Sequence, residues 1–194
     1  DTGFPLRVPL PYVARITPGN AHDPLLRQVL PVSAELTAAD GWSADPLQET
    51  TDAAPPGVLH KYSGRALLVM TGACAINCRY CFRRHYPYAD RQMDNKARNA
   101  AMDYLRADRD LREVILSGGD PLAVNDRQLA ALVGDLDAIE HLRTLRVHTR
   151  LPVVIPQRVC ASLVNWLAAT RLRKVIVLHV NHPNELDSSA VEAI

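Results

Sequence analysis

Apolar residues follow two alternating patterns from about residue 61 onward. Short, nearly continuous apolar runs predict strands buried on both faces at residues 65–71, 113–117, 145–147 and 174–180. Apolar residues at helical spacing predict helices at 95–107, 126–139 and 156–170, and a further helix begins at 187–189. Four βα units in succession predict an α/β fold with a parallel sheet or barrel and right-handed crossovers.

Two residues on these helices carry specific expectations. Asp126 is the expected N-cap of the helix at 126–139, because a carboxylate can accept the free amides of a first turn. Cys160 stands beside Val159 on the helix at 156–170, and we expect it to be an ordinary buried thiol.

Residues 1–60 have a different character. Nine prolines break this stretch into turns and extended pieces, and only residues 23–30 favour a helix, with Pro24 suited to its first turn. We therefore predict a lead-in of residues 1–60 that packs on an α/β part of residues 61–194. Composition assigns the lead-in no chemical role.

Composition and charge remove several classes of function. With 22 basic and 21 acidic residues, the chain has no charge excess that would indicate nucleic acid or a membrane surface as a partner. No apolar run approaches the roughly 20 residues that span a bilayer, and residues 1–5 lack a signal-peptide pattern. Four cysteines, three of them clustered, do not resemble a secreted disulfide framework, so we expect a cytoplasmic protein.

The end of the chain favours a longer protein. The helix that begins near Asp187 has fewer than two turns before residue 194 and no C-cap, and so short a helix is marginal alone. We expect the 194 residues to be the N-terminal part of a larger chain.

The most distinctive chemistry follows the first predicted strand of the sheet. Cys74, Cys78 and Cys81 have the spacing C-x3-C-x2-C, with no fourth cysteine nearby. An iron–sulfur cluster normally takes four thiolates, so three would bind three irons of a [4Fe–4S] cluster and leave one iron open. The alternative is a structural zinc site with His85 or His182 as fourth ligand. Zinc sites usually use paired C-x2-C spacings, so the pattern favours the cluster.

Polar clusters also follow the other three strands, at residues 117–121, 148–150 and 179–185. Because the carboxyl ends of parallel strands lie at one edge of a sheet, where sites are built, we expect a single site there. Each cluster also has a plainer interpretation. Gly118 and Gly119 could simply make a turn rather than admit a ligand to the backbone, and Asp120 could cap a turn before Pro121.

The arginines and histidines near these clusters are similarly open to two interpretations. Arg79, Arg83 and Arg84 could form a solvated basic surface, although their position beside the thiolates favours anion binding. His179 and His182 could be ligand-binding residues or ordinary polar residues at the edge of the sheet.

Four segments together resemble one family. They are RALLVMTGACAINCRYCFRRHYPY, LSGGDPL, RLPVVIPQR and HVNHPNE, and in this order they resemble the lysine 2,3-aminomutase family of the radical S-adenosylmethionine (SAM) superfamily. The segments LRVPLPYVARI, DPLLRQVLP and PGVLHKY are similar to the bacterial branch that serves elongation factor P. The resemblance covers essentially the whole chain.

The resemblance implies a fold, a reaction and a set of cofactors. The fold would be a partial (βα)6 TIM-like barrel, of which this chain supplies about four units. The reaction would be the isomerisation of L-α-lysine to (R)-β-lysine, used by the elongation factor P lysyl ligase. It would need a [4Fe–4S] cluster, SAM, pyridoxal 5′-phosphate and an electron donor such as flavodoxin.

The resemblance also implies roles for individual residues. Cys74, Cys78 and Cys81 would bind the cluster, and Arg83 would bind the lysine carboxylate. The SAM site would use the residues Tyr80 (beside the adenosyl group), Gly118, Gly119 and Asp120 (at the methionyl amino group), and Arg150, His179 and Asn181 (no individual role assigned).

In this family the lysine that binds pyridoxal phosphate lies near the C-terminus. Lys61, Lys96 and Lys174 are the only lysines of this sequence and lack the right context, so we expect the 194 residues alone to be inactive. Two alternatives stay open: a catabolic lysine or glutamate 2,3-aminomutase, and a non-enzymatic metal-binding module.

Overall fold

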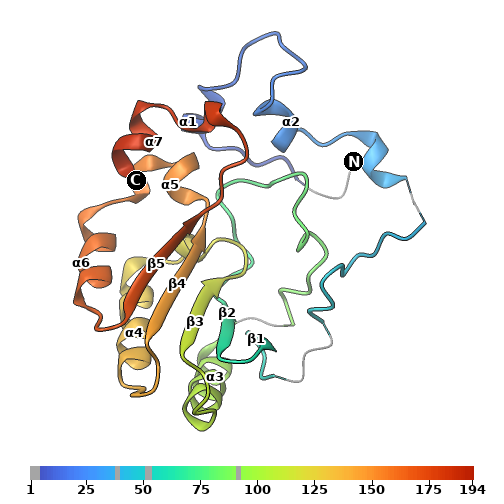
Figure 1. Ribbon diagram of the computed structural model, residues 1–194. Coiled ribbons are helices and arrows are strands. Elements are labelled where there is room, and N and C mark those ends of the chain that lie inside the picture. Colours follow the sequence, from blue (N-terminus) through green and yellow to red (C-terminus); the bar gives the residue numbers. More distant parts are fainter. Residues whose placement is uncertain (1–4, 38–39, 51–53, 91–92) are drawn as a thin grey trace.

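The computed structural model describes residues 5–37, 40–50, 54–90 and 93–194. Its centre is a five-stranded sheet with the strand order β1-β2-β3-β4-β5 (Figure 1). The strands are β1 (Val58–Tyr62), β2 (Arg65–Val69), β3 (Glu113–Ser117), β4 (Thr144–Thr149) and β5 (Arg173–Leu178). β1 is antiparallel to β2, and every other neighbouring pair is parallel. The predicted α/β class and its four parallel strands are confirmed, whereas β1 was not predicted.

Three longer helices connect successive parallel strands: α3 (Asn95–Ala107), α4 (Asp126–Asp137) and α6 (Ala161–Ala169). A shorter helix, α7 (Ser188–Ala193), follows β5. The bounds of α3 agree with the prediction, but the N-cap of α4 is Asn125, whose side chain accepts the amide of Gln128. The prediction of Asp126 as N-cap was wrong. Its carboxylate instead accepts hydrogen bonds from Trp166 of α6 and from Arg158, which precedes α6, so it joins α4 to this region.

The helix predicted over residues 156–170 is interrupted. A short helix α5 (Leu151–Val154) and a 3-10 turn at Pro156–Arg158 precede α6. Pro156 has no amide hydrogen and disfavours helical backbone at the residue before it, so α5 cannot continue. Cys160 has an extended backbone, with φ −112° and ψ 167°, and forms the N-cap of α6. It is exposed, so the prediction of a buried thiol was wrong.

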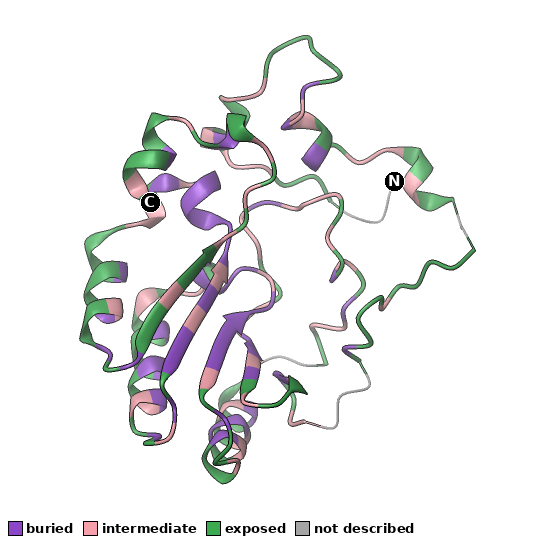
Figure 2. Ribbon diagram, viewed as in Figure 1, coloured by how far each residue is buried: buried purple, intermediate pink, exposed green. Residues whose placement is uncertain are grey.

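The two faces of the sheet are covered differently. Alternate residues such as Leu68, Leu116 and Leu145 are fully buried against α3, α4 and α6. Burial of each such side chain contributes about 1.5–3 kcal/mol. Leu67, His148 and Val177 belong to the other face and line a pocket. β3 and β4 are largely buried, whereas β5 is largely exposed (Figure 2).

The N-terminal segment lies across the carboxyl ends of the strands (Figure 1). It contains α1 (Leu10–Val13), α2 (Leu26–Val29) and a 3-10 turn at Ser33–Leu36. Only the second half of the predicted helix at 23–30 is helical, because the Asp23 carboxylate caps a turn by accepting the amides of Leu25 and Leu26. The predicted boundary at residue 60 falls inside β1, and the division into two parts stays a prediction.

This segment is anchored by packing and by charge. Tyr12, Leu25 and Val29 form one buried cluster with Ile76 of the cysteine loop and Val154 of α5. A separate anchor is Arg15, which pairs with the Asp187 carboxylate at 2.9 Å and donates to the carbonyls of residues 153 and 185. The lead-in is therefore tied to both ends of the α/β part.

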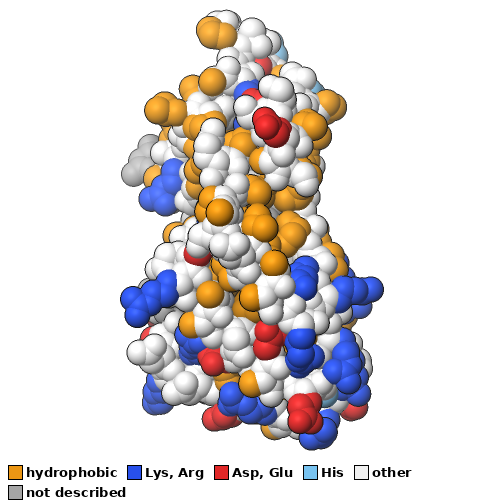
Figure 3. All heavy atoms as spheres, turned by 90° about the vertical axis from the view of Figure 1, so that its left-hand side faces the viewer, with side chains coloured by type: hydrophobic (Ala, Val, Ile, Leu, Met, Phe, Trp, Pro, Cys, Tyr) orange, Lys and Arg blue, Asp and Glu red, His pale blue; other side chains and the backbone are white. Residues whose placement is uncertain are grey.

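The side of the molecule that carries α6 and α7 has a divided surface. Figure 3 shows hydrophobic side chains in its middle and upper parts and many charged side chains in its lower part. Within the described ranges, no helix is both long enough and apolar enough to cross a membrane. The signal-peptide prediction rests on residues 1–5, of which 1–4 lie outside the described residues.

Candidate active site

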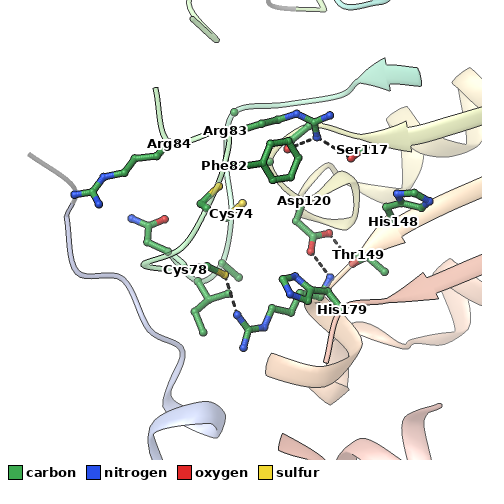
Figure 4. Close-up of a pocket in the computed structure, with 18 of the residues that line it drawn as sticks. Cys74, Cys78, Phe82, Arg83, Arg84, Ser117, Asp120, His148, Thr149 and His179 are labelled. Atoms are coloured by element: carbon green, nitrogen blue, oxygen red, sulfur yellow. Dashed lines mark hydrogen bonds between the residues drawn. The ribbon is translucent and has the colours of Figure 1, made fainter. Parts of the chain in front are cut away.

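A pocket of about 480 Å³ lies where the parallel strands end (Figure 4). Its lining residues come from the loop that follows β2 and from the ends of β3, β4 and β5. The cysteine loop, defined here as residues 70–88, forms one side of the pocket, and the strand ends form the other. The structure thus brings together the four clusters that the sequence places after successive strands.

The cysteine loop contains no helix or strand, and backbone hydrogen bonds hold it on two sides. Toward the sheet, the amide of Gly119 donates to the Thr71 carbonyl at 2.6 Å, and that of Asp120 donates to the Ala73 carbonyl at 2.9 Å. On its outer side, the amide of Asn77 donates to the carbonyl of residue 7 at 2.9 Å. The position of the thiols therefore depends on both the sheet and the lead-in.

Two glycines allow the cysteine loop to lie this close to the sheet. A Cβ at Gly119 would lie 2.3 Å from the Ala73 carbonyl oxygen, and a Cβ at Gly118 would lie 2.8 Å from the Thr71 oxygen. Gly118 also has φ +118°, which side chains rarely adopt. The close approach that these glycines permit is therefore an approach of backbone to backbone.

Cys74, Cys78 and Cys81 are partly buried free thiols that line the pocket. Burial raises the pKa of Cys74 to about 12 and also raises the pKa of Cys81. Such thiols need a strong cationic partner to become thiolates, and a metal centre supplies one.

The arrangement of the thiols distinguishes a cluster from zinc. Four ligands around one zinc at about 2.3 Å must crowd together, whereas cluster cysteines bind separate irons. Among the described residues, no three His, Cys, Asp or Glu side chains gather closely enough to bind a single ion. His182, one candidate zinc ligand, instead accepts the amide of Asn184 within its own turn. The three thiols fit a cluster better than a zinc ion.

Asp120 joins the glycine turn to the end of β4. Its buried carboxylate accepts hydrogen bonds from Thr149 Oγ1 at 2.7 Å and from the amides of Arg150 at 2.7 Å, Leu122 at 3.0 Å and Leu151 at 3.2 Å. Burial raises the pKa of Asp120 more than these donors lower it. These contacts fit the turn-capping interpretation, and contact with SAM stays a prediction for this residue.

Arg150 is the polar centre of the pocket and is only 4% exposed. Its Nη1 donates to Cys78 Sγ at 2.8 Å and to the Tyr80 hydroxyl at 2.9 Å, and its Nη2 donates to Gln28 Oε1 at 2.6 Å and to Glu185 Oε2 at 2.9 Å. Burial would lower the pKa of Arg150, but electrostatic interaction with its acidic neighbours, with Cys78, Tyr80 and Glu185 in that order, raises it. Its buried Nε has no hydrogen-bond partner among the described residues.

Glu185 balances this guanidinium and is fully buried. Its Oε1 accepts from Gln28 Nε2 at 2.9 Å and from the amide of Asn181 at 3.0 Å. Burial would raise the pKa of Glu185, but the hydrogen bond from Gln28 and the charge of Arg150 lower it below the usual value. Neither Gln28 nor Glu185 was predicted from the sequence to be a site residue. Glu185 lay within a quoted motif, whereas Gln28 resembled any polar residue of a short helix.

His179 and Tyr80 line one edge of the same pocket, and Asn181 hydrogen-bonds both of them. His179 Nε2 donates to Asn181 Oδ1 at 2.9 Å, and its ring meets the Tyr80 ring edge-on at 5.9 Å between centroids. The Tyr80 hydroxyl hydrogen-bonds the Asn181 amide group. Burial raises the pKa of Tyr80, so this hydroxyl stays protonated. These three predicted site residues are neighbours, but neither Asn181 nor His182 is among the lining residues of this pocket.

The three arginines beside the cysteines have different surroundings. Arg83 is 8% exposed and holds both oxygens of Glu49, while its Nη1 also donates to Ser117 Oγ at 3.1 Å. Arg79 and Arg84 both pair with Glu35, and Arg84 extends away from the strand ends in Figure 4. No pattern in the sequence pointed to Glu49, which follows an irregular, proline-containing stretch.

Comparisons with known proteins agree with this geometry. The family model described as the radical SAM superfamily matches residues 68–182. L-lysine 2,3-aminomutases of Haemophilus influenzae and Escherichia coli are 49% and 48% identical over 98% of this chain, which covers 56% of each relative. The L-lysine 2,3-aminomutase of Clostridium subterminale is 38% identical over 94% of the chain and 44% of the relative.

The chain thus spans about half the length of the curated relatives it matches. The matched range extends from β2 to the turn that follows β5, and it includes the cysteine loop, the glycine turn and Arg150. This match, which covers more than half of the chain, shows that the chain belongs to the radical SAM superfamily.

Proposed function

We propose that the whole protein is an L-lysine 2,3-aminomutase, an isomerase that converts L-α-lysine to (R)-β-lysine. The observation that carries the proposal is the cysteine loop, whose three thiols line a pocket at the strand ends. The relatives named L-lysine 2,3-aminomutase, at 48–49% identity over 98% of the chain, support this reaction rather than another of the superfamily.

Cys74, Cys78 and Cys81 would hold a [4Fe–4S] cluster with one iron open for SAM. When bound and reduced, the cluster supplies the electron that cleaves the SAM sulfonium and yields the radical for hydrogen abstraction. The protein then contributes position and the exclusion of water.

The remaining lining residues would form the SAM site and the floor of the substrate site. Gly118, Gly119 and Asp120 support the methionyl end, and Tyr80 with His179 and Asn181 supports the adenosyl end. Arg150 contacts Cys78 and Tyr80 of the cysteine loop, between the residues at the methionyl end and those at the adenosyl end. These assignments rest on the resemblance, on the lining of a single pocket and, for Asn181, on its hydrogen bonds to His179 and Tyr80.

Arg83 is the proposed partner of the lysine carboxylate. The Nε and Nη2 atoms of its guanidinium already bind Glu49. A substrate carboxylate would therefore bind through Nη1, which contacts Ser117 Oγ. Among the residues that the structure describes, no lysine lines this pocket: Lys61 and Lys174 donate to the carbonyls of residues 47 and 170. We place the lysine that binds pyridoxal phosphate outside these 194 residues, in the rest of a (βα)6 barrel.

The cysteines allow a direct test of the cluster. Anaerobic reconstitution with iron and sulfide should give a brown protein with about four irons per chain. Replacement of Cys74, Cys78 or Cys81 by Ala should each abolish this iron content. Cys160→Ala is the matched control, because Cys160 is exposed on α6 and should leave the iron content unchanged. A colourless protein that retains one zinc would contradict the proposal.

Formation of β-lysine tests the reaction itself. The whole protein, reconstituted and given SAM, pyridoxal phosphate, L-lysine and a low-potential donor such as flavodoxin, should release (R)-β-lysine, whereas the 194 residues alone should not. Release of β-lysine by the 194 residues would show that our placement of the pyridoxal phosphate lysine is wrong.

We further propose that the product serves elongation factor P through its lysyl ligase, in a reducing cytoplasm. Support comes from the lead-in segments that resemble this branch. The catabolic alternative predicts isomerisation of free lysine or glutamate with no effect on elongation factor P. The mass of elongation factor P in cells with and without the gene separates the two.

A further inference from the structure

Cys78 differs from the other two loop cysteines in its hydrogen-bond donor. Its sulfur lies 2.8 Å from Arg150 Nη1, so it faces a charged side-chain donor. For Cys81, burial raises the pKa of the thiol and the backbone N–H of Arg83 lowers it in part. The carbonyl of Cys74, rather than its sulfur, accepts the hydrogen bond of Arg7 at 3.1 Å. One of the three thiols thus carries a guanidinium partner.

The guanidinium is held in this position from several directions. The amide of Arg150 is bound by Asp120 at 2.7 Å, and its Nη2 is bound by Gln28 and Glu185. Tyr80 shares Nη1 with the sulfur, at 2.9 Å. A side chain with this many partners, 4% exposed, cannot turn away from the cysteine without leaving a buried acceptor unpaired.

Hydrogen bonds to a cluster's sulfurs are one of the factors that set its reduction potential. A donor withdraws electron density from the sulfur and stabilises the reduced cluster, which has gained one negative charge. A positive charge in a water-poor site has the same effect, and more strongly than in water. The buried carboxylate of Glu185 offsets part of that charge.

We propose that Arg150, through its contact with Cys78, raises the reduction potential of the cluster, and that Glu185 limits this rise. The inference rests on the proposed cluster and adds to it a residue that sets the potential. Arg150 does not transfer electrons itself. It changes how readily a low-potential one-electron donor reduces the cluster.

The test is a redox titration of the reconstituted protein without SAM, followed by electron paramagnetic resonance of the reduced cluster. Arg150→Met removes both the donor and the charge. At a fixed applied potential we expect its ratio of reduced to oxidised cluster to fall about tenfold, a shift of about 59 mV for one electron. Glu185→Gln removes the offsetting charge and should shift the ratio in the opposite direction.

Two further variants separate this role from a purely structural one. Arg150→Lys keeps the charge and should give a smaller shift than Arg150→Met. Arg158→Met is the matched control, because Arg158 also lies near a cysteine sulfur, 3.7 Å from Cys160, and also pairs with a carboxylate, that of Asp126. It should leave the potential unchanged.

Each outcome decides the matter. Shifts of opposite sign for the two charge variants support the inference. An unchanged potential in Arg150→Met with full iron content overturns it, while the proposed cluster stands. If Arg150→Met binds no cluster, the other two variants test the inference. A lower reduction potential in Arg150→Lys and a higher one in Glu185→Gln support it, and any other result overturns it. A wild-type protein that forms no cluster would overturn the inference together with the proposed function.

Discussion

Arg83 and Glu49 form a buried, two-pronged ion pair: Nε lies 2.7 Å from Oε2, and Nη2 lies 2.8 Å from Oε1. Both side chains are 8% exposed. The pair joins the lead-in to the cysteine loop just beyond the last cysteine, so it fixes one wall of the pocket. Parallel hydrogen bonds of this kind also set the plane of the guanidinium.

Replacement of Glu49 by Gln should destabilise the protein strongly. The change leaves the Arg83 charge buried without its counter-ion, which costs about 3–5 kcal/mol in comparable pairs. Urea unfolding measures the loss. Asp103→Asn is the control, because the pair of Asp103 with Arg106 is exposed on α3 and contributes at most about 1 kcal/mol. Equal losses in the two variants would contradict a structural role for the buried pair.

Glu185 makes stability depend on pH. Its pKa in the folded protein is lowered below the usual 4.5, so its contribution to the free energy of unfolding is present above pH 4.5 and is lost as the pH falls through the folded pKa. Wild type and Glu185→Gln should therefore differ in free energy of unfolding at neutral pH and converge in acid. Asp120 has a raised pKa and acts in the opposite direction, but it does so equally in both proteins. A difference that stays constant with pH would contradict this assignment.

Gly119→Ala should displace the cysteine loop, since the new Cβ would lie 2.3 Å from a backbone oxygen that has no room to move aside. We expect reconstitution to incorporate less iron per chain, measured with iron and sulfide assays. Gly134→Ala in α4 is the matched control: nothing lies within 4 Å of the added Cβ. It should keep full iron content and gain up to about 1 kcal/mol of stability from helix propensity.

Thr149→Val should weaken the link between β4 and the glycine turn. The variant loses the 2.7 Å hydrogen bond to Asp120 and leaves a buried carboxylate with one donor fewer, at a cost of about 1–3 kcal/mol. Thermal and urea unfolding give the value. Thr50→Val removes a hydroxyl bonded to Asp45 on the exposed surface, and we expect it to behave as an ordinary surface substitution. A Thr149 variant as stable as the Thr50 variant would argue against a buried link.

The repeating part of the fold could be predicted because its signals are local. β2 to β5 and α3 have apolar runs or helical spacing within a few residues, and the polar clusters follow the strands directly. β1 was missed because only its first two residues are buried, so its sequence shows no continuous apolar run. The break before α6 was missed because proline at a first helical turn is also a favourable start.

The polar half of the site could not be predicted in the same way. Gln28 reaches Glu185 across 157 positions of sequence, and Glu49 reaches Arg83 across 34. Neither residue stands in a periodic pattern, and each is an ordinary surface type unless its partner is known. Local spacing reveals which residues lie at the same end of the strands. It does not show which side chain, distant in sequence, forms hydrogen bonds or ion pairs with them.

These long spans also have a consequence for the order in which the protein folds. Arg15 bonds to Asp187 and Gln28 to Glu185 across 172 and 157 positions, so the lead-in cannot take its final place until the turn after β5 exists. A chain emerging from the ribosome can pair β2, β3 and β4 first, while its N-terminal residues wait with solvated polar groups. Contacts of such high sequence separation are slow to form. Completion of the pocket wall should thus be among the last events of folding. Until the lead-in is in place, the cysteine loop stays accessible to iron.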